Sequence, residues 1–168
     1  MARLAGLGWF ECNWIWAVAV AVGDQAPLIA LLDQHGKQCR SDQLAGKSLV
    51  LFFYPKDETP GCTAEACAFR DSYADLQALG AEVWGVSGDG AASHQRFASR
   101  HNLPYPLLVD QGNKLRQAFG VPAVLGLLPG RVTYVIDGQG VIRHIFNNLL
   151  DGAAHRNQAR AALQRLAL

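Results

Sequence analysis

The chain has 168 residues, which is enough for one domain with a substantial core and too few for two. Half of the residues are hydrophobic, 17% are charged and the formal net charge is +1, so this balance favours neither nucleic acid nor an anionic membrane as a partner. Four cysteines are too few for a secreted scaffold held together by disulfides. Two of them, Cys62 and Cys67, lie close together and point to chemistry instead.

Residues 1–22 differ from the rest of the chain. They contain the apolar run 14–22, which is shorter than the ~20 residues that a membrane-spanning helix needs. We interpret them as an N-terminal extension that leads into the first strand, because the alternation of alanine and valine at 17–22 suits a strand. A secretory signal or a membrane anchor is the alternative, with Arg3 as its basic residue and a small-x-small cleavage site at 19–21.

Residues 23–168 form the main domain in this interpretation. The protein is then expected to be cytoplasmic and without stable membrane insertion. Under the alternative it is exported or membrane-associated through residues 1–22.

Strands and helices alternate along the main domain. Apolar runs rich in β-branched and aromatic residues predict strands, and apolar residues at three- and four-residue steps predict amphipathic helices. The predicted strands are 28–33, 48–54, 82–86, 106–109, 131–136 and 141–146, and the predicted helices are 62–79, 91–101, 113–119 and 153–166. This α/β pattern, which ends in a hairpin and a helix, predicts a thioredoxin-like fold with a central mixed β-sheet flanked by helices. No Gly-x-Gly-x-x-Gly fingerprint opens a helix, which argues against a dinucleotide cofactor.

Cys62 stands at the start of the predicted helix 62–79, just beyond a buried strand. The unpaired N–H groups and the dipole at a helix N-terminus favour a negative charge. Such a site can lower a thiol pKa from about 8.5 to roughly 3.5–7.5, and the thiolate is the nucleophilic form. Thr59 lies three residues upstream, within reach of the sulfur, while Pro55 and Pro60 stiffen the loop and shield it. We therefore expect Cys62 to be a reactive cysteine.

The segment 53–67, FYPKDETPGCTAEAC, resembles the peroxiredoxin family. Its Pro55-x-x-x-Thr59-x-x-Cys62 matches the family's Pro-x-x-x-Thr/Ser-x-x-Cys active-site motif. The second cysteine five residues on is similar to the peroxiredoxin Q, or bacterioferritin-comigratory-protein, branch. The resemblance covers residues 23–168 and includes Arg131, which matches the family's active-site arginine.

The resemblance implies a thiol peroxidase of antioxidant defence that reduces hydrogen peroxide and organic hydroperoxides. The Cys62 thiolate would become a sulfenic acid while Thr59 and Arg131 hold the peroxide. Cys67 would then close a disulfide with Cys62, and thioredoxin or a similar dithiol would reduce it. The resemblance further implies a monomer that needs no metal and no organic cofactor.

Other interpretations of the two cysteines stay open. A non-catalytic thiol redox sensor would use the same residues, and a general thiol–disulfide oxidoreductase would share the fold, although its Cys-x-x-Cys is absent. Two cysteines on a helix are also often small buried apolar residues. A metal site is disfavoured, because no second Cys/His pair has ligand spacing and because we place His94 and His101 on a polar helix.

Three further residues receive structural interpretations. Glu65 is expected to satisfy a backbone N–H near the start of its helix. Cys12 and Cys39 have no partner at motif spacing and are expected to be free thiols.

The cysteine spacing predicts movement if the disulfide forms. Five residues along an α-helix separate two Cα atoms by roughly 8–9 Å. A disulfide tolerates at most ~7 Å. The segment 61–69 is therefore expected to be helical in the reduced protein and to unwind on oxidation.

Overall fold

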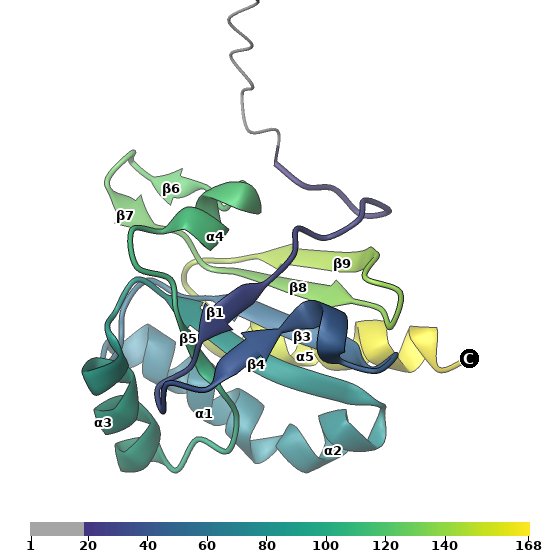
Figure 1. The fold of residues 1–168 in the computed structure, drawn as a ribbon, viewed down its shortest axis with the longest axis horizontal. Coiled ribbons are helices and arrows are strands. Elements are labelled where there is room, and N and C mark those ends of the chain that lie inside the picture. The colour runs from purple at the N-terminus through teal and green to yellow at the C-terminus, as the bar shows by residue number, and fades with distance from the viewer. Residues whose placement is uncertain (1–18) are drawn as a thin grey trace, which may run out of the picture.

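The computed structural model describes residues 19–168, and its centre is a five-stranded mixed sheet in the order β5-β4-β3-β8-β9 (Figure 1). These strands are β3 (Ser48–Phe53), β4 (Ala81–Ser87), β5 (Leu107–Val109), β8 (Val132–Ile136) and β9 (Ile142–Asn147). β4 is parallel to both β3 and β5, whereas β8 is antiparallel to both β3 and β9. The predicted thioredoxin-like fold with a central mixed sheet is confirmed.

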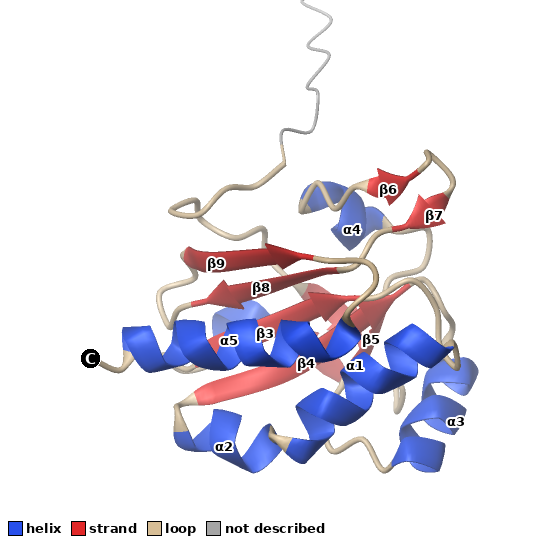
Figure 2. Ribbon diagram, turned by 180° about the vertical axis from the view of Figure 1, so that it is seen from behind, coloured by secondary structure: helices blue, strands red, loops and turns tan. Residues whose placement is uncertain are grey.

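Within residues 19–168, five α-helices flank this sheet: α1 (Pro60–Asp71), α2 (Tyr73–Ala78), α3 (Ala91–His101), α4 (Lys114–Ala118) and α5 (Gly152–Leu166). α1, α2 and α5 lie on the same face of the sheet (Figure 2). α4 packs with β1 on the opposite face, where its Leu115 joins a second buried cluster. The sheet therefore separates two hydrophobic cores.

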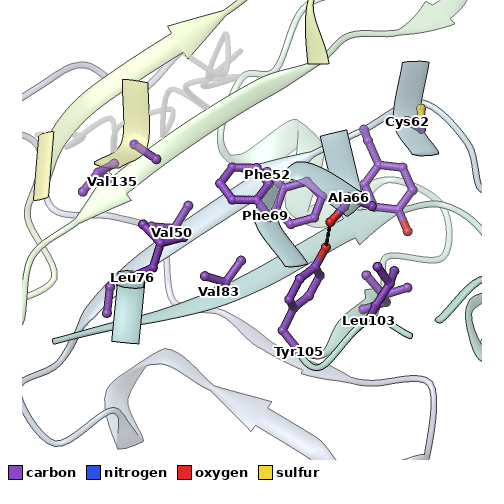
Figure 3. Packing of buried hydrophobic residues seen from close by; sticks show 14 of the residues in the cluster. Val50, Phe52, Cys62, Ala66, Phe69, Leu76, Val83, Leu103, Tyr105 and Val135 are labelled. Atoms are coloured by element: carbon purple, nitrogen blue, oxygen red, sulfur yellow. Dashed lines mark hydrogen bonds between the residues drawn. The ribbon is translucent and has the colours of Figure 1, made fainter. Parts of the chain in front are cut away.

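β3 is buried on both faces because its side chains alternate between these two cores. Val50 and Phe52 face the helices α1 and α5, and the Phe52 ring stacks on Phe69 of α1 at a centroid distance of 4.7 Å (Figure 3). Leu49 and Leu51 face the other core. The predicted buried strand 48–54 is thus confirmed, and it fixes the point at which the chain turns toward α1.

The remaining elements are short. β1 (Ala30–Leu32) and β2 (Gln38–Arg40) form an antiparallel hairpin, followed by the 3-10 helix η1 (Ser41–Gln43). β6 (Ala123–Val124) and β7 (Leu128–Pro129) form another hairpin. The sequence analysis did not predict β2, β6 or β7, and it ran α1 and α2 together where the structure has a break at Ser72.

The prediction of a strand from the alternation at 17–22 is wrong for residues 19–22, the part of this segment that the structure describes. Residues 19–22 form no strand, although Val20 N–H donates to the carbonyl of Phe119. The rest of that prediction, with the signal or anchor alternative, falls on residues 1–18 and lies outside the described residues. Within residues 19–168, no helix is both long and apolar enough to cross a membrane.

Candidate active site

Cys62 lies in the first turn of α1, as the sequence predicted. Thr59 is the N-cap, Pro60 occupies the first helical position and Cys62 is the third helical residue. Proline suits that first position because its missing N–H is one that a helix leaves unpaired anyway. The cysteine side chain is buried, with 1% of its surface exposed, so the dipole of a twelve-residue helix acts on a sulfur shielded from water.

Arg131, at the start of β8, is brought against this sulfur from a distant part of the chain. Its Nη2 lies 3.3 Å from Cys62 Sγ, its Nη1 donates to Glu65, and its Nε donates to the carbonyl of Leu149 at 3.1 Å. Burial alone would lower the pKa of Arg131, but its interactions with Glu65 and Cys62 outweigh burial and raise that pKa. A fixed positive charge therefore faces the cysteine, and it favours the thiolate.

Thr59 and Pro55 lie on the loop that joins β3 to α1. The Thr59 hydroxyl donates to the carbonyl of Lys56 at 3.0 Å rather than to the cysteine sulfur. With its proton committed there, the hydroxyl has only lone pairs left to offer a ligand at the site. Pro55 is half-buried at the start of this loop.

A buried network that the sequence analysis missed anchors the same loop. The carboxylate of Asp57 accepts hydrogen bonds from Tyr54 at 2.7 Å, from Ser93 at 2.8 Å and from His94 Nδ1 at 2.8 Å. Burial by itself would raise the pKa of Asp57, but these hydrogen bonds outweigh it and lower that pKa. The loop that carries Thr59 is thereby tied to α3.

His94 lies on a helix that is polar overall, as expected, but its own side chain faces the core. Its side chain is fully buried, and it shares one face of α3 with Phe97 and Ala98. Its Nδ1 faces the Asp57 carboxylate and its Nε2 lies 3.1 Å from the carbonyl oxygen of Leu108. Both groups are acceptors, so the ring is held in place from both of its nitrogens. The i, i+3, i+4 spacing of these three residues was the signal that could have revealed the buried position.

Arg116 of α4 is a second buried arginine that the sequence analysis missed. Its Nη1 donates to the carbonyl of Gly130 and its Nη2 to the carbonyl of Tyr54, both at 2.7 Å. Gly130 directly precedes Arg131, and Tyr54 directly precedes Pro55. Burial lowers the pKa of Arg116. One guanidinium thus holds together the two backbone segments that carry the predicted site residues.

Cys67 lies on the same helix as Cys62 and is half-buried. Both are free thiols, and α1 is continuous through both of them. The turn between them is tied down by Tyr105, whose hydroxyl donates to the carbonyl of Ala66 at 2.6 Å (Figure 3). The segment that carries both thiols is therefore helical, as expected for the reduced protein.

The other structural interpretations have mixed outcomes. The prediction that Glu65 satisfies a backbone N–H near the start of α1 is wrong. The side chain is fully buried and accepts a hydrogen bond from Arg131 instead. Cys39 is a free and buried thiol whose pKa is raised by burial and then by Asp33. Cys12 lies outside the described residues. Within residues 19–168, no group of three or more His, Cys, Asp or Glu side chains is arranged to hold a metal ion.

The fold and the site together define a class of protein: a thioredoxin-like protein with a buried cysteine at a helix N-terminus and an arginine in contact with the sulfur of that cysteine. The sequence profile of the AhpC/TSA family matches residues 22–145. A wheat (Triticum aestivum) protein named peroxiredoxin Q, chloroplastic, is 50% identical over 148 residues, which are 88% of this chain and 68% of the wheat protein.

Solved structures agree with this relationship. Peroxidoxin BcpB from Mycobacterium tuberculosis matches with a TM-score of 0.80 and 35% identity, over 86% of this chain and 97% of that chain. The Xanthomonas campestris bacterioferritin comigratory protein, whose structures were described for its alkyl peroxide reduction activity, matches with a TM-score of 0.76 and 30% identity over 83% and 92% of the two chains. The chain belongs to the AhpC/TSA family, and it is a thiol-dependent peroxidase of the peroxiredoxin Q type.

Proposed function

We propose that Cys62 is the residue that attacks the peroxide and that Arg131 is its main electrostatic partner. The observation that carries this assignment is the 3.3 Å contact between Arg131 Nη2 and the buried Cys62 Sγ at the start of α1. A thiolate in this position is stabilised by the helix dipole and by the guanidinium. The same charge can stabilise the oxygen that leaves when the O–O bond breaks.

The proposed first step oxidises Cys62. The Cys62 thiolate bonds to the terminal oxygen of a hydroperoxide, the O–O bond breaks, and the leaving oxygen takes up a proton as water or an alcohol. Thr59 accepts a hydrogen bond from the peroxide hydroxyl, because its own proton is given to Lys56. Pro55 helps to keep bulk water from the sulfur. The product is a sulfenic acid on Cys62.

Cys67 completes the cycle in this proposal. Its sulfur bonds to the Cys62 sulfur, water leaves, and the resulting disulfide is reduced by a dithiol, for which we propose thioredoxin. The two cysteines lie only five residues apart on α1, which supports an intramolecular disulfide once the turn between them has unwound. Hydrogen peroxide and alkyl hydroperoxides are the proposed substrates, and the name of the Xanthomonas structure supports the second class.

A coupled assay tests the assignment. Peroxide consumption is followed with thioredoxin, thioredoxin reductase and NADPH for the wild type, Cys62→Ser and Cys67→Ser. Cys62→Ser should abolish turnover, because a serine hydroxyl is not ionised near neutral pH. Cys67→Ser should still consume one equivalent of peroxide but should not turn over with thioredoxin. Turnover by Cys62→Ser at the wild-type rate would refute the assignment, and a single stoichiometric reaction in the wild type would favour a redox sensor.

Assembly, location and the role of the N-terminus stay predictions. We propose that the protein is a monomer in solution, which sedimentation would test, and that residues 1–22 form an extension dispensable for catalysis. The sequence predicts a cytoplasmic location, whereas the wheat relative is chloroplastic by name. Fluorescent fusions of the full chain and of a shortened chain starting at Ala19 would show whether the extension directs the protein to another compartment.

A further inference from the structure

A buried cluster of polar side chains lies next to Arg131. Glu65 comes from α1, Thr133 from β8 and His155 from α5, and the Glu65 and His155 side chains are fully buried. α5 can approach α1 closely here because residue 152 is a glycine. A Cβ at this position would lie 2.6 Å from the carbonyl oxygen of Gly61.

The position of the hydrogen on His155 follows from its partners. Nε2 lies 2.7 Å from the carbonyl oxygen of Asn148, which can only accept, so Nε2 carries a hydrogen. Burial, with the charge of Arg131 acting in the same direction, lowers the pKa of His155 to about 4, so the ring is neutral near pH 7. Nδ1 is therefore an acceptor, and it faces Thr133 Oγ1 at 2.8 Å and Glu65 Oε1 at 3.4 Å.

The carboxyl group of Glu65 has one satisfied oxygen and one that lacks a partner. Oε2 accepts from Arg131, whereas Oε1 has no hydrogen-bond partner among the described residues. If Glu65 were ionised, a lone pair of Oε1 would face His155 Nδ1, itself an acceptor, at 3.4 Å and buried from bulk solvent. A proton on Oε1 would turn that repulsion into a hydrogen bond and give Oε1 a partner, which it would share with the Thr133 hydroxyl that lies 2.8 Å from the same nitrogen. Burial acts in the same direction, since it raises the pKa of Glu65 to about 8 against the influence of Arg131.

We propose that Glu65 is a neutral carboxylic acid that donates to His155 Nδ1, so that the charge of Arg131 is left to the Cys62 thiolate. This rests on the role proposed above for Cys62 and Arg131. The other titratable groups near Glu65 are Arg131, Cys62 and Tyr105, whose pKa burial raises well above its usual value. Asp151 is the further charged group that acts on His155.

The proposal has a consequence for the sulfur. An ionised Glu65 would compete with the thiolate for one guanidinium, and the thiolate would be less stable. A protonated Glu65 keeps its hydrogen bond to Arg131 without neutralising it. Glu65 and His155 are then positioning residues that act on Cys62 through Arg131.

The first test replaces the acid by its neutral amide. Glu65→Gln can accept from Arg131 and donate to His155, as the protonated acid would. The rate at which iodoacetamide alkylates Cys62, followed by mass spectrometry of its peptide at a series of pH values, gives the midpoint of its ionisation. We expect this midpoint to stay within about 0.3 units of the wild type. If Glu65 were ionised, losing its charge would lower the midpoint by about one unit or more, and the proposal would fail. Asp71→Asn, which removes an exposed carboxylate from the same helix, is the matched control.

The second test removes the acceptor. In His155→Leu the neutral acid loses its hydrogen bond, so Glu65 ionises more readily and the Cys62 alkylation rate at pH 7 should fall roughly two- to tenfold. The double variant Glu65→Gln/His155→Leu should return to the wild-type rate, because no carboxyl group is left to ionise. A purely structural role of His155 predicts that the double variant stays as slow as the single one, which would contradict the proposal.

An infrared measurement supplies a readout that needs neither folding of the His155 variant nor catalysis. The wild type should show a carboxylic-acid carbonyl band near neutral pH that is lost in Glu65→Gln and kept in Asp71→Asn. If Glu65→Gln leaves every such band in place, Glu65 is ionised and the proposal is wrong. None of these three tests depends on peroxide turnover. Failure of the function proposed for Cys62 would appear instead as an active Cys62→Ser variant, so the two failures are distinguishable.

Discussion

Tyr105→Phe tests the idea that α1 must unwind before the two cysteines can meet. The Tyr105 hydroxyl donates to the carbonyl of Ala66 at 2.6 Å, between Cys62 and Cys67 on α1. Removing the Tyr105 hydroxyl does not leave the Ala66 carbonyl unpaired, because in an α-helix this carbonyl also accepts a hydrogen bond from the N–H four residues further on. The variant therefore loses one stabilising contact of the helical state and none of the unwound state.

The size of the effect follows from that one hydrogen bond. A neutral hydrogen bond contributes about 0.5–1.5 kcal/mol net. Since 1.4 kcal/mol corresponds to a factor of ten, the unwound population should rise roughly two- to twelvefold. Disulfide formation from the Cys62 sulfenic acid should become faster by a similar factor, and less sulfinic acid should form in excess peroxide.

The assay mixes reduced protein with one equivalent of peroxide, quenches at intervals and counts free thiols in Cys62 and Cys67 peptides. Tyr134→Phe is the matched control, because Tyr134 is another buried tyrosine whose hydroxyl bonds a carbonyl, that of Phe119 at 3.3 Å, in the other core. The control should leave the disulfide rate unchanged. Should Tyr105→Phe form the disulfide no faster than wild type, unwinding of this turn does not limit the step.

Three further predictions concern the site and its supports. Arg131→Ala should slow the alkylation of Cys62 by iodoacetamide at pH 7 and slow its oxidation by peroxide at least about tenfold, as alkylation and stopped-flow rates would show; unchanged rates in both would remove Arg131 from the site. Asp57→Asn should lower the melting temperature more at pH 7 than at pH 3: because folding lowers the pKa of Asp57, its stabilisation is present above the usual value of about 4 and is lost as the pH falls through the lower folded value. An equal loss at both pH values would contradict this. Gly152→Ala should cost about 1–3 kcal/mol in urea unfolding, since its Cβ would lie 2.6 Å from a carbonyl oxygen of α1. A variant as stable as the wild type would show that α5 can shift.

Periodicity in the sequence was enough to predict the sheet strands and most helices. β3 reads as a continuous apolar run because both of its faces are buried, and α3 was predicted with the bounds that the structure has. β2, β6 and β7 are only two or three residues long, which is too short for an alternation to be recognised. Their pairing depends on neighbouring strands rather than on a local pattern.

The polar supports of the site were harder to predict than the reactive residues. Cys62 and Arg131 could be found from the motif and from the resemblance, but Glu65 and Arg116 look like ordinary charged surface residues in the sequence. Both are buried because their partners come from β8 or from loops far away in the chain. A single sequence does not reveal such long-range pairs, since a buried charged residue has the same charge and the same spacing along the helix as an exposed one.

The two bonds of Arg116 have a consequence for how the chain can vary. Because this side chain binds the carbonyls of both Tyr54 and Gly130, the arginine-bearing segment has an anchor in addition to the hairpin β6–β7 that precedes it. That hairpin carries the highly exposed Leu125 and Leu127. It is therefore the part of the molecule where a change of length, an inserted epitope or a surface attachment point should be accommodated with the smallest displacement of the reactive centre.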